Sequence, residues 1–265
     1  MSNLALLTSI DGKITRASEA VLPMPDDGLL RGDGVFEVLR CYSGKPFALR
    51  EHLDRLERSA GAIGLDIARR EIEFEAAALI ERADTPDCLL RIVVTRSGRR
   101  IISTENLLIH PSSISLATVT YTPTVILNGV KSLSYAANME ATRIAKRAGA
   151  ADALLVTPEG IVLEAPTSTL FWVSEEGPLR TTALEAGVLH SITRAKIIER
   201  CEVELGSFPL RDVMNATEAF LASTTREVQP VETIDGHRIP TYPAPRTLEA
   251  AAAFQEALKE DLPPG

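Results

Sequence analysis

Residues 131–138 read Lys-Ser-Leu-Ser-Tyr-Ala-Ala-Asn, and their first residue lies between an apolar segment, residues 125–130, and a predicted helix, residues 135–148. The first residue of this stretch, Lys131, is one of only six lysines in a chain that has 22 arginines. A lysine can lose its proton when it is desolvated and then act as a nucleophile, whereas an arginine stays protonated. Lys131 is therefore a candidate for amine chemistry, although its position alone also fits an ordinary surface lysine in a loop.

Downstream of this stretch, strands and helices are mixed. The helix predicted over residues 135–148 ends at Gly149, because glycine commonly terminates helices. Closely spaced runs of β-forming residues follow, and a Pro-Glu-Gly turn joins two of them. The further elements that we predict are strands over residues 153–157, 161–164, 169–173 and 219–223, and helices over residues 193–201 and 245–258.

Upstream, the sequence predicts a smaller group of elements. Residues 35–42 (VFEVLRCY) alternate as in a strand, and the turn Ser-Gly-Lys-Pro before residues 47–49 indicates a hairpin. We also predict helices over residues 51–63 and 70–82 and strands over residues 88–96, 107–110 and 115–121. Residues 122–130 contain proline, asparagine and glycine, and they predict a linker between a small N-terminal domain (1–121) and a larger C-terminal domain (131–265). Because both parts mix strands and helices, the expected fold class is α/β or α+β.

The composition of the 265 residues argues against several classes of function. With 36 acidic and 28 basic residues the net charge is −8, so the chain has no general electrostatic attraction to nucleic acid or anionic lipid. No apolar run approaches the ~18 residues of a membrane span. The three cysteines show no CxxC spacing. We expect a cytoplasmic protein that binds neither nucleic acid nor membranes.

Several familiar catalytic motifs are missing from the sequence. Its four histidines are scattered without the spacing of metal ligands, so we expect no metal site. Neither a GxSxG nucleophile elbow nor a Walker loop occurs. The Gly-Asp-Gly triplet at residues 32–34 precedes a strand instead of linking a strand to a helix. It therefore predicts a tight turn and not a dinucleotide-binding loop.

Five strings, taken together, resemble the class IV aminotransferases, which are the fold-type IV pyridoxal-phosphate enzymes. They are GDGVFEVLR (32–40), REHLDRL (50–56), the stretch from residue 131 to ADALLVTPEGIVLE (151–164), GVLHSITR (187–194) and FLASTTREVQPV (220–231). Each string is weak alone, but all five stand in the order that the family has. The resemblance implies a two-domain fold with a small N-terminal α/β domain and a larger C-terminal domain that has a mixed, β-barrel-like core.

The resemblance also implies which residues hold pyridoxal 5'-phosphate. Lys131 would form a Schiff base with the cofactor, and Tyr135 would hydrogen-bond its phenolate oxygen. These two residues are four apart, so we expect one helical turn to bring their side chains to the same side. Glu164 would pair with the protonated pyridine nitrogen, which makes the ring an electron sink. The alternative for Glu164 is a carboxylate that faces solvent at the end of a strand.

The same resemblance assigns the phosphate group to residues in several segments. Arg50 matches the phosphate arginine of the family, and an ion pair with Asp54 one turn later is compatible with that role. Ile192 and Thr193 open a predicted helix, whose first N–H groups suit an anion. Thr224 or Thr225 would add a hydroxyl and an amide, and the sequence leaves open which one.

The sequence indicates the substrate-binding residues less specifically than the cofactor-binding residues. The resemblance places Phe36 and Val38 there, and a substrate carboxylate calls for an arginine, for which Arg31, Arg99 and Arg100 are candidates. An ordinary solvated basic loop is the alternative. The strings resemble D-amino-acid transaminases more than branched-chain enzymes, so we favour a transaminase for small amino acids and 2-oxo acids.

Several other activities remain open at this point. They are an aminodeoxychorismate lyase that releases pyruvate, a branched-chain L-amino-acid or (R)-amine transaminase, and a cofactor-binding protein without turnover. The family's active sites receive a loop from a neighbouring subunit, so the resemblance also implies a homodimer.

Overall fold

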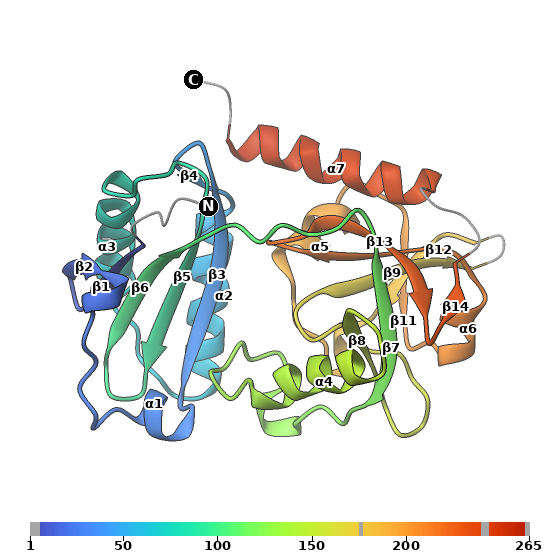
Figure 1. Ribbon diagram of the computed structural model, residues 1–265, viewed down its shortest axis with the longest axis horizontal. Coiled ribbons are helices and arrows are strands. Elements are labelled where there is room, and N and C mark those ends of the chain that lie inside the picture. The colour runs from blue at the N-terminus through green and yellow to red at the C-terminus, as the bar shows by residue number, and fades with distance from the viewer. Residues whose placement is uncertain (1–5, 175–176, 240–243, 263–265) are drawn as a thin grey trace. The chain divides into compact units, whose positions relative to one another are not determined.

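The first sheet is built around β3 (Gly34–Tyr42), which forms where the alternating pattern predicts a strand. It pairs antiparallel with β5 (Cys88–Thr95), from Gly34 opposite Thr95 to Cys41 opposite Cys88. The other strands are β1 (Leu7–Ile10), β2 (Lys13–Arg16), β4 (Lys45–Pro46) and β6 (Arg100–Glu105). Their order is β2-β1-β6-β5-β3-β4 (Figure 1).

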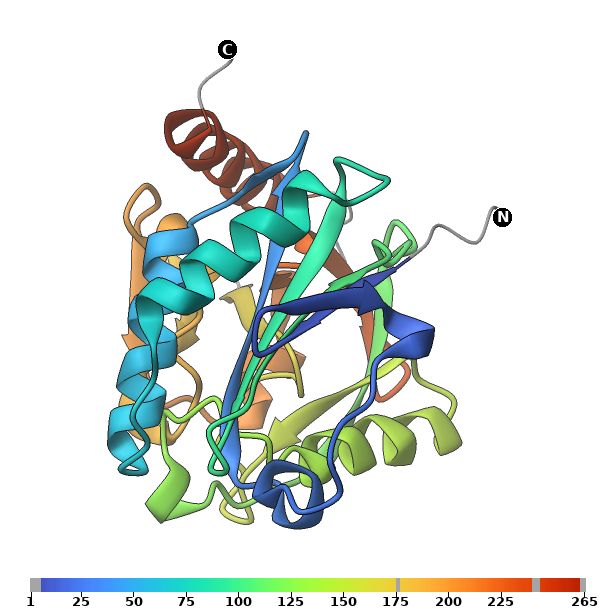
Figure 2. The same cartoon turned by 90° about the vertical axis from the view of Figure 1, so that its left-hand side faces the viewer.

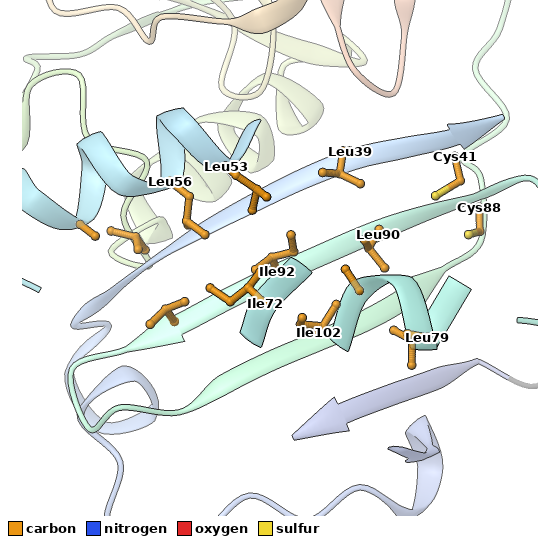
Figure 3. Packing of buried hydrophobic residues seen from close by; sticks show 14 of the residues in the cluster. Leu39, Cys41, Leu53, Leu56, Ile72, Leu79, Cys88, Leu90, Ile92 and Ile102 are labelled. Carbon is orange, nitrogen blue, oxygen red and sulfur yellow. The ribbon is translucent and has the colours of Figure 1, made fainter. Parts of the chain in front are cut away.

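Two helices, α2 (Leu49–Ala62) and α3 (Arg69–Glu81), cover one face of this sheet (Figure 2). Leu53 and Leu56 of α2 and Ile72 of α3 pack against the strands in a fully buried cluster (Figure 3). Because side chains alternate along a strand, the opposite face of β3 carries Phe36 and Val38. A short helix, α1 (Asp27–Arg31), and a 3-10 turn (Ala17–Glu19) lie in the segment between β2 and β3.

The second sheet is mixed and has the order β11-β10-β9-β12-β13-β7-β8, with β14 paired to β13. Its strands are β7 (Ile114–Thr120), β8 (Asp152–Val156), β9 (Thr169–Ser174), β10 (Leu179–Thr182), β11 (Val203–Gly206), β12 (Ala216–Ser223), β13 (Glu227–Ile234) and β14 (His237–Arg238). The helices beside it are α4 (Ala136–Arg147), α5 (Ile192–Ile198), α6 (Leu210–Met214) and α7 (Pro245–Asp261), and 3-10 turns occur at Val125–Leu127 and Leu184–Ala186 (Figure 1). Gly149 follows α4 with a φ of +87°, as expected of a terminating glycine.

This computed structural model describes residues 6–174, 177–239 and 244–262, and its contacts divide the chain into two units. The first unit comprises Met1–Leu108 with Val130–Tyr135, and the second comprises Ile109–Gly129 with Ala136–Gly265. The predicted boundary at residues 122–130 is therefore wrong in two places. Strand β7 pairs with β8 and β13, so it belongs to the second unit. The segment around Lys131 hydrogen-bonds to β3, so it belongs to the first.

Three other local predictions differ from the structure. Residues 107–110 form no strand, since Leu108 and Ile109 are 60% and 94% exposed and a proline follows at 111. Residues 161–164 make only single bridges, such as Val162 with Val156, so their apolar run is not a full strand. The predicted hairpin arm at residues 47–49 is wrong, because the second arm is β4 (Lys45–Pro46) and α2 already begins at Leu49. Among the described residues, no helix is long and apolar enough to cross a membrane, and none of their His, Cys, Asp and Glu side chains group to hold a metal.

Candidate active site

The backbone of Lys131 is held between a strand and a helix of the first unit. Its carbonyl oxygen accepts a hydrogen bond from the Phe36 N–H (3.0 Å), and its N–H donates to Ser59 Oγ of α2 (3.2 Å). Leu133 N–H donates in the same way to the Gly34 carbonyl oxygen (2.9 Å). The lysine segment thus runs along the edge of β3, which fixes where the side chain starts.

The amine of Lys131 lies against two aromatic rings. Its Nζ is 4.4 Å from the centroid of the Phe36 ring and 5.8 Å from that of Tyr135. The two rings contact each other edge to face, with centroids 5.3 Å apart. The prediction that a helical turn aligns Lys131 with Tyr135 is wrong, because α4 begins only at Ala136. Contact with Phe36 brings the two side chains together instead.

Behind Phe36, on the helix-covered face of β3, lies a buried ionic group. Glu37 is 0% exposed, and its carboxylate accepts from Arg55 Nε (2.6 Å), from Arg55 Nη2 (2.7 Å) and from His52 Nδ1 (2.8 Å). Burial raises the pKa of Glu37, but the charge and hydrogen bonds of Arg55 and His52 outweigh it and lower the pKa to about 2. Burial lowers the pKa of His52, and the charges of Arg55 and Lys131 act in the same direction. Glu37 and Arg55 therefore compensate each other's charge inside the core.

The phosphate arginine predicted on α2, Arg50, is exposed at the first turn of that helix. The residue before the helix, Ala48, has a φ of +51°, and no side chain caps the helix N-terminus. Asp54, the expected partner of Arg50, instead accepts a hydrogen bond from Arg69 Nη1 (2.6 Å). Asp54 is thus engaged by another arginine of the same unit.

The three arginines predicted on the substrate side all form ion pairs. Arg31 pairs with Asp27 within α1, and both side chains are exposed. Arg99 Nη1 donates to Asp11 (2.7 Å). Partial burial raises the pKa of Asp11, but the hydrogen bonds and charges of Arg99 and Arg100 lower it further than burial raises it.

Arg100 forms an ion pair with a buried carboxylate. Its Nε donates to Glu75 Oε1 (2.8 Å), and Glu75 is only 5% exposed. The other carboxylate oxygen of Glu75 accepts from Ser9 Oγ (2.9 Å). Removing Arg100 from this pair would leave a buried carboxylate without its cation. We conclude that Arg100 has a structural role in the first unit.

Two residues near Lys131 and Phe36 were missed by our sequence reasoning, Arg91 of β5 and Ser59 of α2. Arg91 stands opposite Val38 in the β3–β5 register, and its guanidinium is 5.7 Å from the Phe36 ring centroid. The alternation Leu89, Arg91, Val93 along a predicted strand was the available signal, because it puts Arg91 on the face that the helices do not cover. Ser59, which holds the Lys131 N–H, gave no signal, because a serine within a predicted helix is usually unremarkable.

In the second unit, Glu164 is held by backbone contacts. Its Oε1 accepts the N–H of Leu189 (2.9 Å), and its carbonyl oxygen accepts the N–H of Leu155 in β8 (2.9 Å). Burial raises the pKa of Tyr121, and the negative charge of Glu164 raises it further. Burial lowers the pKa of Arg194, whereas the charge of Glu164 acts against that change. Glu164 is therefore a half-buried residue whose negative charge raises the pKa of Tyr121 and opposes the lowering of the pKa of Arg194.

The N-terminus of α5 also lies in the second unit. Ser191 caps this helix, since its Oγ accepts the N–H of Arg194 (3.2 Å). The amides of Ile192 and Thr193 have no acceptor within the helix, as expected for its first turn. Both residues are buried. The first turn of α5 thus has two backbone N–H groups without an acceptor inside the helix, the kind of group that binds anions at helix N-termini.

The predicted threonines occupy the turn between β12 and β13. Thr224 and Thr225 are half-buried, and Ser223 Oγ lies 3.4 Å from Thr225 Oγ1. By type, these groups suit pyridoxal phosphate, because the first unit carries an amine and an arginine and the second carries a carboxylate, hydroxyls and amides. Two mixed α/β units, the first of which holds Lys131 beside β3, agree with the class that the sequence resemblance implies, the fold-type IV transaminases.

Comparison with known proteins agrees with this class. Residues 34–234 match the family described as Amino-transferase class IV. A D-alanine aminotransferase of Bacillus licheniformis is 29% identical over 94% of this chain and 95% of its own length. A putative branched-chain-amino-acid aminotransferase of Methanocaldococcus jannaschii is 33% identical over 87% and 88% of the two chains.

Among solved structures, a hypothetical aminotransferase from Mycobacterium tuberculosis in a PLP-bound form superposes with a TM-score of 0.85. It is 25% identical, and the match covers 96% of this chain and 99% of that one. The chain therefore belongs to the class IV aminotransferase family and is a pyridoxal-phosphate-dependent aminotransferase. The predicted family, fold class and cofactor are confirmed.

Proposed function

We propose that this enzyme transfers an amino group between a small amino acid and a 2-oxo acid, with D-amino acids favoured and Lys131 as the anchor of the cofactor. The observation that carries the proposal is the setting of the Lys131 amine, half-buried against the Phe36 and Tyr135 rings and fixed at its backbone. A lysine amine is the group that can attack the aldehyde of the cofactor, and here it is held at a fixed place beside β3. The bias toward D-amino acids rests on the strings of residues 32–38 and 223–225 and on the D-alanine aminotransferase relative.

We assign the roles of the other residues from the family resemblance, and the chemistry of each residue suits its role. Bound pyridoxal phosphate supplies an electron sink for the charge left when a substrate loses its α-proton. Lys131 moves that proton, Tyr135 donates a hydrogen bond to the phenolate oxygen, and Glu164 keeps the ring nitrogen protonated. The phosphate is bound by Arg50, by Ile192 and Thr193, and by Thr224 or Thr225.

Of the arginines, we place Arg31 and Arg99 ahead of Arg100 as ligands of the substrate carboxylate. The exposed pair of Arg31 with Asp27 costs little to exchange, since such pairs contribute at most about 1 kcal/mol. Arg100 is retained by the buried Glu75. Phe36 and Val38 complete the substrate side in this proposal, which includes a homodimer as the active form.

The deciding experiment is a half-reaction screen of the purified holoenzyme. D- and L-amino acids and (R)-1-phenylethylamine are added singly, and the conversion of bound cofactor to its amine form is followed by absorbance. We expect D-alanine to react faster than L-leucine and L-alanine. A faster reaction with L-leucine makes the enzyme a branched-chain transaminase, and pyruvate released from aminodeoxychorismate without an amino acceptor makes it a lyase.

Arginine variants test the carboxylate ligand in the same assay. Arg31→Ala and Arg99→Ala are compared with Arg58→Ala, an exposed residue of α2. The variant that has lost the ligand should react more slowly with D-alanine by about tenfold or more, because a desolvated carboxylate then lacks its partner. Its reaction with the amine, which has no carboxylate, should not change. Unchanged D-alanine kinetics in both variants would contradict the assignment.

A further inference from the structure

The connection between β12 and β13 is a short loop that contains no glycine. Ser223 pairs with Glu227, so only residues 224–226 form the loop. Glu227, which closes it, has a φ of +55°, a left-handed conformation that a residue with a side chain adopts at a cost. Three-residue hairpin loops commonly place glycine at such a position. The turn therefore needs other contacts to hold it.

Arg226 supplies those contacts with its side chain, which is only 11% exposed. Its Nη2 donates to Asp152 Oδ2 at the start of β8 (3.0 Å), and its Nε donates to Ser168 Oγ (3.2 Å). Its Nη1 donates to Gln229 Oε1 (2.5 Å). One guanidinium thus ties the turn to β8, to β13 and to the residue that precedes β9.

The surroundings of this guanidinium are almost closed to solvent. Asp152 is 4% exposed, and its other oxygen accepts from Thr142 Oγ1 (2.8 Å) and the N–H of Ala153 (2.9 Å). His110 Nδ1 lies 3.4 Å from Arg226 Nη1, and burial together with the Arg226 charge lowers the pKa of His110. Asp152 is then the anion that balances Arg226 at this position.

The backbone on the other side of the turn carries the threonines. Arg226 N–H donates to Ser223 Oγ (3.3 Å), and the same oxygen lies 3.4 Å from Thr225 Oγ1. The Arg226 side chain therefore points inward from the loop that presents Thr224 and Thr225. We infer that Arg226 is a positioning residue for the phosphate of the cofactor, acting through the conformation of these two threonines. The inference rests on the proposed role of the threonines in phosphate binding.

The experiment compares two ligands that differ only in the phosphate. Apo wild type, Arg226→Ala and Arg226→Lys are titrated with pyridoxal 5'-phosphate and with pyridoxal, and binding is followed by absorbance well below each variant's melting temperature. Arg180→Ala is the matched control, since Arg180 also binds Asp212 and Glu204 with several hydrogen bonds in the second unit. The ratio of the two dissociation constants measures the phosphate advantage of each protein.

We expect Arg226→Ala to lower the phosphate advantage about tenfold, the effect of losing one charge-assisted set of hydrogen bonds at the turn. Arg226→Lys keeps a charge for Asp152 but cannot reach Ser168 and Gln229 together, so an intermediate ratio is expected. Arg180→Ala should keep the wild-type ratio even if its melting temperature falls. This keeps general destabilisation separate from the phosphate effect.

Three outcomes would overturn the inference, two of them through the Arg226 variants and one through the wild type. An Arg226→Lys protein that folds and retains the full wild-type ratio, or an Arg226→Ala protein that weakens both ligands equally, gives Arg226 a structural role only. A wild type that binds pyridoxal as tightly as its phosphate refutes the proposed phosphate site itself. That result would come from the wild-type titration alone, before any variant is considered.

Discussion

Replacing Glu37 with glutamine should destabilise the first unit strongly. The variant would leave Arg55, which is 5% exposed, without the carboxylate that now accepts two of its hydrogen bonds. Removing the charge of one partner of a buried ion pair costs about 3–5 kcal/mol, because the other charge then lacks the anion that compensated it. Glu73→Gln is the matched control, since Glu73 pairs with Arg69 on the exposed side of α3. That pair should contribute at most about 1 kcal/mol.

The acid dependence of stability gives the same quantity independently. The folded pKa of Glu37 is about 2, below its value of about 4.3 in an unfolded chain. A lowered folded pKa stabilises the protein above the unfolded pKa, and this stabilisation is lost as the pH falls through about 2. The difference corresponds to roughly 3 kcal/mol at about 1.4 kcal/mol per pKa unit. Glu37→Gln should lack this part of the acid transition.

The assay must report on the correct unit. The only tryptophan, Trp172, lies in β9 of the second unit, so its fluorescence would follow a different part of the chain. Hydrogen exchange measured by mass spectrometry on peptides from α2 and β3 reports on the first unit directly. Exchange in Glu37→Gln should accelerate far more than in Glu73→Gln. Equal exchange in the two variants would refute the reasoning about the buried pair.

Two further predictions concern the cofactor. Glu164→Gln should slow α-proton removal, and with it kcat, at least tenfold while the melting temperature changes little, because the lost interaction is used mainly in the transition state; wild-type turnover in a stopped-flow half-reaction would contradict this. Arg50→Ala should weaken retention of pyridoxal phosphate about tenfold, because one charge-assisted contact is lost, whereas Arg58→Ala on the exposed face of the same helix should retain it. Equal loss of cofactor from the two proteins on dialysis would remove Arg50 from the phosphate site.

The sequence predicted those elements whose pattern lies within a single short segment. Alternation over residues 35–42 predicts both faces of β3, and it separates Phe36, on the face that α2 and α3 do not cover, from Glu37 on the face that they cover. The role proposed for Lys131 comes from the resemblance of the strings to the family, because no periodicity indicates it. Helical spacing predicts α2 and α3 to within two residues at each end.

What the sequence did not predict depends on contacts between distant segments. Val130–Tyr135 returns to the first unit because its backbone hydrogen-bonds to β3, and backbone hydrogen bonds leave no mark on side-chain pattern. Residues 161–164 have the composition of a strand, but they form only single bridges. In the sequence, Arg226 is a basic residue in a loop, and only the fold shows that it pairs with Asp152. Such partners are separated by many residues, so only the folded chain shows them.

The central claim is that Lys131 holds the cofactor, and one measurement tests it most directly. The holoenzyme is reduced with borohydride, digested and mapped by mass spectrometry, so that the pyridoxyl group is located on a single peptide. We predict that the group is on Lys131, and that Lys131→Ala yields no labelled peptide while keeping its hydrogen-exchange pattern. A pyridoxyl group on Lys146 or Lys196 in the wild type would contradict the account.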